Sequence, residues 1–305
     1  MRNALVFGGG GGKGAYEIGV WRALREMGAE KNFSCVLGTS VGALNAALFA
    51  QKALDNAEYI WRNITPKTIL TDNWGKGEAF ASQDGLRQLL LRYVSLMPSD
   101  LSVYVCCSKV IAPPETPPFA SDFGVLRPEG LPYPGAGDFK LFGVNLAETY
   151  QPEYFHLNRL TKWEQVQCLM ASAALPFAFD AVEINGAAYR DGGFRPEDNL
   201  PYRKAASLGY TRILAVSLDS GVVHELSCGN ARILVLYPSV SLGDAVSGTL
   251  DFEASGADWR MRLGYQDTMS RRETIYAFLD VSTSGRKNAL TLAQQERLRQ
   301  IFRNP

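Results

Sequence analysis

Five consecutive glycines, Gly8–Gly12, directly follow the short apolar segment 4–7. Glycine loses more conformational freedom on folding than any other residue and adds no side chain to a core. A run of five therefore marks backbone that must come close to another group, which can be a phosphate, a dinucleotide or a reacting oxygen. The run limits the start of the chain to a strand, a functional loop and a following helix.

A phosphate-binding P-loop does not fit the glycine run. That loop needs a glycine, four residues, and then Gly-Lys followed by Ser or Thr. When the chain is aligned on Gly12 and Lys13, Phe7 stands at the first position and Gly14 at the last. Both ends of the motif therefore fail.

A dinucleotide-binding loop fits only slightly better. Its G-x-G-x-x-G pattern matches at Gly9, Gly11 and Gly14, but five glycines in a row make such a match nearly automatic. The fold also needs an acidic residue at the end of the second strand, about 20 residues further on. That place holds the sequence Gly-Thr-Ser at 38–40.

The first 50 residues alternate between strand and helix patterns. Segment 4–7 is typical of a strand, apolar residues recur at helical spacing over 15–28, and 33–37 and 41–50 continue as strand and helix. This alternation predicts an α/β fold with a mostly parallel sheet and helices on its faces. The uncharged stretch 33–50 contains several polar residues, so a buried strand, turn and helix explain it better than a membrane span.

Further elements are predicted downstream: helices at about 55–63, 84–95, 161–174 and 200–208, and strands at 101–107, 139–145, 181–184, 187–190, 212–218 and 232–237. Thr161 and Glu164 fit a capping box at the start of a helix. Asn185 and Gly186 fit the two-residue turn of a hairpin. The proline-rich segment 112–137 predicts a long inserted loop of the kind that forms lids or binding loops, with disorder as the alternative.

We expect one domain over residues 1–305, because the sequence contains no internal repeat and no clear linker. Its core spans about 4–270, with the insert at about 112–137. A helical segment at about 271–305 follows and ends with the helix 291–302, where Thr and Gln fit another cap.

The composition excludes several functions. Lys and Arg together number 31, as do Asp and Glu, so no overall field favours nucleic acid. The five cysteines are scattered without the paired spacing of a zinc site, which argues against a metal and predicts free thiols in a reducing compartment.

Only four apolar residues precede the glycines, too few for an export signal. We expect a cytoplasmic protein, with a peripheral location at membranes as a further possibility.

A G-x-S-x-G motif occupies residues 38–42, with Ser40 at its centre. The two glycines allow a sharp turn between strand and helix that exposes the serine oxygen at the helix N-terminus. The helix dipole favours an anionic nucleophile there. An uncharged strand pattern precedes the motif and an Ala- and Leu-rich helix pattern follows it, so Ser40 is the candidate nucleophile.

A serine nucleophile needs a base, and the sequence offers several. Asp191 ends a predicted hairpin strand and precedes two glycines, but an aspartate of ordinary pKa, about 3.9, needs a partly desolvated pocket to act as a base. Ser40, then Asp191 or Asp219, then His224 follow the Ser, Asp, His order of the α/β-hydrolase triad. In that fold, however, several strands come before the turn that carries the serine. His156 lies just before the capped helix.

These motifs together resemble the patatin-like phospholipase family of serine acyl hydrolases. The resemblance rests on the glycine run 9–14, the motif 38–42 and Asp-Gly-Gly at 191–193, in this order. The stretches 171–177 and 198–201 are also similar to the family. Three motifs in order are far more specific than any one of them.

The resemblance covers about residues 4–270 and is weakest from 60 to 160. It implies a three-layer α/β/α fold with a mostly parallel sheet and a nucleophile elbow after an early strand. The implied site residues are the nucleophile Ser40, its base Asp191, and the oxyanion donors Gly9, Gly10, Gly11 and Val41. Lys13 would either hold the glycine loop in place or bind an anionic head group.

The implied activity is hydrolysis of carboxylic esters of lipids, of the phospholipase A or lysophospholipase type, through a Ser40 and Asp191 dyad. It requires no metal and no organic cofactor. The implied partners are a lipid or acyl-ester substrate and a membrane or micelle met transiently, with no nucleic acid. The alternatives are a triad esterase that uses His224 and a non-catalytic lipid-binding protein that keeps the fold.

Overall fold

The computed structural model describes residues 2–69, 71–72, 81–98, 101–111, 150–175, 179–194, 196–221 and 224–281. The strands of its main sheet are β1 (Asn3–Phe7), β2 (Cys35–Thr39), β5 (Ser102–Val110), β6 (Tyr150–His156), β7 (Val182–Ile184), β8 (Ala187–Asp191), β9 (Arg212–Val216), β10 (His224–Cys228) and β11 (Ala231–Leu236). A separate short ribbon pairs β3 (Thr71–Asp72) with β4 (Ala81–Ser82).

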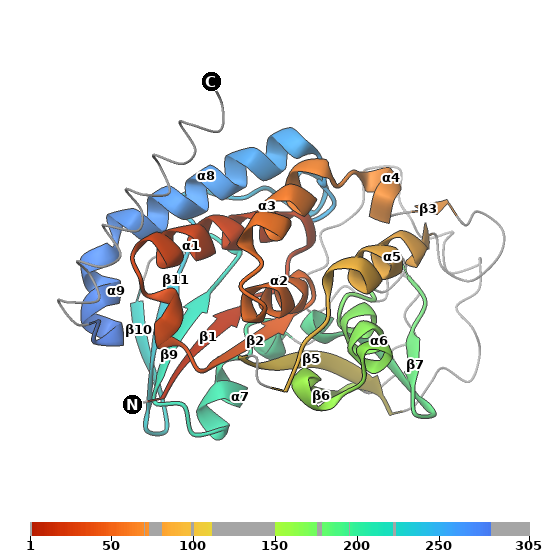
Figure 1. Cartoon of the computed structure of the whole chain (residues 1–305), viewed down its shortest axis with the longest axis horizontal. Coiled ribbons are helices and arrows are strands. Elements are labelled where there is room, and N and C mark those ends of the chain that lie inside the picture. The colour runs from red at the N-terminus through yellow and green to blue at the C-terminus, as the bar shows by residue number, and fades with distance from the viewer. Residues whose placement is uncertain are drawn as a thin grey trace, which may run out of the picture.

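The helices surround this sheet (Figure 1). They are α1 (Ala15–Glu26), α2 (Val41–Ala50), α3 (Leu54–Asn63), α4 (Pro66–Ile69), α5 (Asp84–Tyr93), α6 (Lys162–Ser172), α7 (Tyr202–Ser207), α8 (Ala254–Ser270) and α9 (Arg272–Leu279). Within the described residues no helix is both long and apolar enough to cross a membrane.

The main sheet is mixed, with a parallel centre. Its order is β10-β11-β9-β1-β2-β5-β8-β7, and β6 pairs with β5 off this path. The strands β11, β9, β1, β2 and β5 run parallel, whereas β10, β6, β8 and β7 pair antiparallel. Strands β1 and β2 are buried at every residue, as expected for parallel strands covered on both faces.

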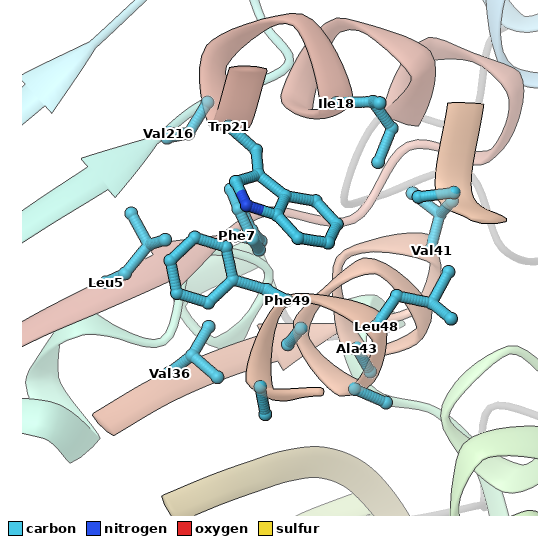
Figure 2. Packing of buried hydrophobic residues seen from close by; sticks show 14 of the residues in the cluster. Leu5, Phe7, Ile18, Trp21, Val36, Val41, Ala43, Leu48, Phe49 and Val216 are labelled. Carbon is cyan, nitrogen blue, oxygen red and sulfur yellow. The ribbon is translucent and has the colours of Figure 1, made fainter. Parts of the chain in front are cut away.

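Alternate residues of β1 face two different apolar layers, because side chains on a strand alternate between faces. Leu5 and Phe7 pack with residues of α1 and α2 (Figure 2). The ring centroid of Phe49 lies 6.0 Å from that of Phe7 and 5.2 Å from that of Trp21. Ala4 and Val6 belong to the second layer, together with residues of β9, β11 and α7. The sheet therefore has helices on both faces, which confirms the three-layer α/β/α fold.

Helix α8 lies along the outer side of α1 (Figure 1). A Cβ atom at Gly19 of α1 would lie 2.0 Å from the carbonyl oxygen of Met261, and one at Gly264 of α8 would lie 2.1 Å from that of Tyr16. The two backbones therefore touch, and only glycine fits at these positions.

Most predicted elements in the described residues are confirmed. Helix α2 has the predicted bounds, the Thr161 and Glu164 capping box is formed at the start of α6, and Asn185 and Gly186 turn the hairpin with φ of 52° and 77°. The strand predicted at 33–37 lies two residues later, because Phe33 still follows a short 3-10 turn.

Other predictions were incomplete or lie elsewhere. Strands β6 and β10 were missed. The insert 112–137, the strand at 139–145 and the helix 291–302 lie outside the described residues. The single domain stays a prediction.

Candidate active site

Strands β2 and β8 meet end to end along one edge of β5. Residues 104–106 of β5 pair with β2 on one side and β6 on the other, and residues 107–109 pair with β8 and β6. Both β2 and β8 therefore lie on the edge opposite β6, and they run toward each other. Thr39 pairs with Cys106, and Asp191 pairs with Cys107. This pairing brings Ser40, the residue after β2, next to Asp191.

The turn at Ser40 has the geometry of a nucleophile elbow. Ser40 has φ of 54° and ψ of −129°, a conformation that costs a non-glycine residue about 1–3 kcal/mol. A Cβ at Gly38 would lie 2.2 Å from the carbonyl oxygen of Gly42, and one at Gly42 would lie 2.6 Å from that of Gly8. Both motif glycines are thus required by close backbone contacts. Ser40 lies at the N-terminus of α2, where the helix dipole stabilises negative charge.

Asp191 is buried with only 2% of its surface exposed. Burial raises the pKa of this carboxyl to about 6, against the opposing effects of the Ser40 hydroxyl and the Gly193 N–H group. Gly193 donates its N–H to Asp191 Oδ1 at 2.7 Å. Oδ2 makes no hydrogen bond in the described part of the chain.

The Ser40 hydroxyl is therefore near enough to lower the pKa of Asp191, yet a well-formed hydrogen bond between the two side chains is not present. Catalytic hydrogen bonds are often long in unliganded enzymes and tighten when substrate binds. A carboxylate with a pKa of about 6 and one free oxygen can accept a proton from a neighbouring hydroxyl at neutral pH.

The glycine loop lies beside Ser40, since a Cβ at Gly9 would lie 3.1 Å from Ser40 Cβ. Gly9 donates its N–H to the carbonyl oxygen of Asn199 at 3.1 Å. Its amide is not free, and the prediction of Gly9 as an oxyanion donor is corrected for this reason. The N–H groups of Gly10, Gly11 and Val41 have no acceptor among the residues that the structure describes.

Asn199 is a site residue that the motif analysis did not single out. Besides accepting the Gly9 N–H, it donates its side-chain Nδ2 to the Gly9 carbonyl at 3.3 Å. A Cβ at Gly193 would lie 2.5 Å from Asn199 Oδ1, so the same side chain also packs against the loop after Asp191. The sequence signal that could have identified Asn199 is its position in 198–201, a stretch similar to the family.

Neither histidine belongs to a strand that pairs with β2. His224 belongs to β10, four strands away from β2 in the sheet. At about 4.8 Å between neighbouring strands, this is a separation of about 19 Å. The His156 ring stacks on Tyr104, with 4.4 Å between centroids, and burial lowers its pKa. The triad with His224, left open by the sequence, is therefore contradicted by the distance between the strands.

The described residues also contain no cluster of three or more His, Cys, Asp or Glu side chains suited to a metal ion. The chemistry available at this site comes from a buried carboxyl, a serine at a strained turn and backbone amides.

The sequence model for patatin-like phospholipases matches residues 5–206, which include the glycine loop, Ser40 and Asp191. The chain belongs to the patatin-like phospholipase family. A similar curated protein is patatin-like phospholipase domain-containing protein 7 of Mus musculus, 36% identical over 74 residues, or 24% of this chain and 5% of the mouse protein. The chain thus spans about one-twentieth of that relative's length.

Among solved structures, VipD from Legionella pneumophila is similar to this chain with a TM-score of 0.49 and 14% sequence identity. The likeness covers 90% of this chain and 67% of that one.

In this patatin-like chain, a segment that lies after the matched residues packs on the glycine loop. A Cβ at Gly11 would lie 2.1 Å from the carbonyl oxygen of Thr249, and one at Gly12 would lie 2.0 Å from that of Asp251. Arg260 of α8, only 2% exposed, holds this segment through Asp251 Oδ2 at 2.9 Å and the Ser247 carbonyl at 2.7 Å. The motifs gave no signal for this support of the loop.

Proposed function

We propose that the chain is a lipid acyl hydrolase in which Ser40 is the nucleophile and Asp191 its base. The observation that carries the proposal is the meeting of β2 and β8 on β5, which brings a serine at a strained elbow next to a buried carboxyl. The pKa of Asp191, raised to about 6 by burial, suits a base that works near neutral pH. Membership of the family supports lipid esters as the substrate class.

In the first step, the Ser40 hydroxyl transfers its proton to Asp191 while its oxygen attacks the ester carbonyl. The carbonyl electron pair moves to the oxygen and forms a tetrahedral oxyanion. This intermediate collapses, the bond to the leaving alcohol breaks, and Asp191 returns the proton to that alcohol. The product is an acyl-enzyme on Ser40 and a released alcohol.

In the second step, a water molecule attacks the acyl-enzyme carbonyl and gives a proton to Asp191. The second oxyanion collapses, the bond to the serine oxygen breaks, and the proton passes to that oxygen. The acid is released and both side chains regain their starting state. Each proton lost by an attacking oxygen is accepted by Asp191, so no second base is needed.

The N–H groups of Gly10, Gly11 and Val41 are the proposed oxyanion donors. Their lack of an acceptor in the described residues supports this assignment. Loss of one such donor typically lowers kcat by about 10²–10³ fold. Gly11 lies against the Thr249 carbonyl, where a Cβ atom does not fit. A larger residue at Gly11 would therefore displace the loop and turn these amides away from the site.

Lys13 is proposed to bind an anionic part of the substrate. It is only 6% exposed, and its ammonium group forms no ion pair with another described residue. A buried cation without a carboxylate partner is rare. A lipid head group that carries a phosphate would provide the missing negative charge.

The test is labelling with a fluorescent fluorophosphonate together with hydrolysis of p-nitrophenyl esters of increasing chain length. We expect both activities in the wild type and their loss in Ser40→Ala and Asp191→Asn. Ser227→Ala, at an exposed serine of β10, and Asp219→Asn, at an exposed aspartate, are the matched controls and should stay active. A folded wild type that neither labels nor hydrolyses any of these esters, also with phospholipid micelles added, would contradict the proposal and favour a lipid-binding protein.

A further inference from the structure

The last residue of α6 and the turn that follows it hold the backbone of both proposed catalytic residues. Ser40 donates its N–H to Ser172 Oγ at 2.9 Å, and Asp191 donates its N–H to the Ala174 carbonyl at 3.0 Å. Two positions therefore separate the two acceptors along the chain. Neither contact belongs to the sheet, so this end of α6 adds to the pairing on β5.

The Ser172 hydroxyl both donates and accepts a hydrogen bond. Its side chain is completely buried, and Oγ donates to the carbonyl oxygen of Cys106 at 2.7 Å while it accepts the Ser40 N–H. Cys106 pairs with Thr39, and the next residue, Cys107, pairs with Asp191. One hydroxyl thus links the elbow to the point of β5 where β2 and β8 meet.

The strained turn makes this link necessary. Ser40 adopts φ of 54°, outside the regions that an L-residue prefers, and the surrounding structure must hold it there. Its N–H is buried and precedes the first turn of α2, where no carbonyl of the helix can accept it. The Ser172 hydroxyl accepts this N–H, which would otherwise be buried without a partner.

We infer that Ser172 is a positioning residue, which sets the distance from the Ser40 oxygen to Asp191 and to the oxyanion amides. The inference rests on the proposed function of the same site. Among the described residues Ser172 Oγ makes no hydrogen bond to the carboxyl group of Asp191, so its loss should misplace the nucleophile without changing the base. Small displacements of a reacting group are costly, and about 1 Å lowers the rate about 10² fold.

The experiment compares the wild type with Ser172→Ala, Ser172→Thr and the control Thr268→Val. Thr268 Oγ1 also donates to a carbonyl at 2.7 Å and is 1% exposed, but it lies in α8 on the outer side of α1. We expect Ser172→Ala to lower kcat for a p-nitrophenyl ester about 10- to 100-fold with KM within about twofold of the wild type. The rate of fluorophosphonate labelling should fall by a similar factor.

Two further readouts separate positioning from loss of stability. The acid limb of kcat/KM should keep the same midpoint in Ser172→Ala, since Asp191 is unchanged. Ser172→Thr, which keeps the hydroxyl, should recover most of the wild-type kcat, and Thr268→Val should equal the wild type. If Ser172→Ala does not fold, Ser172→Cys takes its place, because a thiol is a much weaker hydrogen-bonding group of similar shape.

Wild-type kcat in the folded Ser172→Ala or Ser172→Cys variant would overturn the inference, and so would an equal loss in Thr268→Val. An inactive wild type would overturn both the inference and the proposed function. An active wild type with an unaffected Ser172→Ala would overturn the inference alone.

Discussion

Replacement of Asp191 by asparagine should abolish turnover and yet stabilise the fold at neutral pH. Burial raises the pKa of this carboxyl from 3.8 to about 6. Between about pH 4 and 6 the carboxyl is therefore mostly protonated in the folded chain and mostly ionised in the unfolded chain. Stability is therefore lost as the pH rises through this window. Above it, the ionised carboxylate lowers the free energy of unfolding by about 3 kcal/mol, at about 1.36 kcal/mol for each pH unit.

Asparagine has nearly the same shape and never ionises. Its oxygen can still accept the Gly193 N–H that now bonds Asp191 Oδ1 at 2.7 Å. We expect Asp191→Asn to exceed the wild type in free energy of unfolding by about 0.5 kcal/mol at pH 4 and about 3 kcal/mol at pH 8. In a chain of this length, the difference at pH 8 corresponds to a rise in Tm of roughly 5 °C.

The assay is urea unfolding followed by circular dichroism at pH 4, 6 and 8. Asp219→Asn, at an exposed carboxyl, is the control and should change the free energy of unfolding by less than about 0.5 kcal/mol at each pH. If the difference between Asp191→Asn and the wild type is the same at pH 4 and pH 8, the argument that burial opposes ionisation of Asp191 is wrong.

Other measurements test the site and the fold. The value of kcat/KM should fall below about pH 6 as Asp191 takes up a proton, and a profile that stays flat from pH 5 to 8 would exclude this carboxyl as the base. His224→Ala should keep kcat within about threefold of the wild type, whereas a loss of about 10³ fold or more would indicate a triad. Gly19→Ala should lower the free energy of unfolding by about 3 kcal/mol or more in thermal or urea unfolding, because its Cβ would lie 2.0 Å from the Met261 carbonyl oxygen. An unchanged Tm in that variant would show that α1 and α8 can move apart at little cost.

The parts of the fold with strong local signals could be predicted from the sequence. Gly38 and Gly42 flank Ser40 between a strand and a helix pattern, and the close contacts of both glycines explain why the motif has this form. The capping box of α6 was predicted because Thr161 and Glu164 interact over a single turn.

Features that depend on distant partners could not be predicted. Strand β6 contains Pro152 and several polar residues, so its pattern is weak, and β10 is a short antiparallel edge strand. The hydrogen bond of the Gly9 amide depends on Asn199, and that of the Ser40 amide depends on Ser172. No local pattern reveals which carbonyl or hydroxyl a folded chain brings to a given amide.

The end-to-end meeting of β2 and β8 also decides when during synthesis the site can exist. At about 5–20 residues per second, a ribosome adds Asp191 roughly 8–30 s after Ser40, because about 150 residues separate them. Through that interval the growing chain carries Ser40 without Asp191, its proposed base. Since a shift of β8 by one residue would turn Asp191 to the other face of the sheet, the serine gains its partner only when β8 has docked in register on β5. In a nascent chain the proposed catalytic pair is thus incomplete until β8 has been made and has paired with β5.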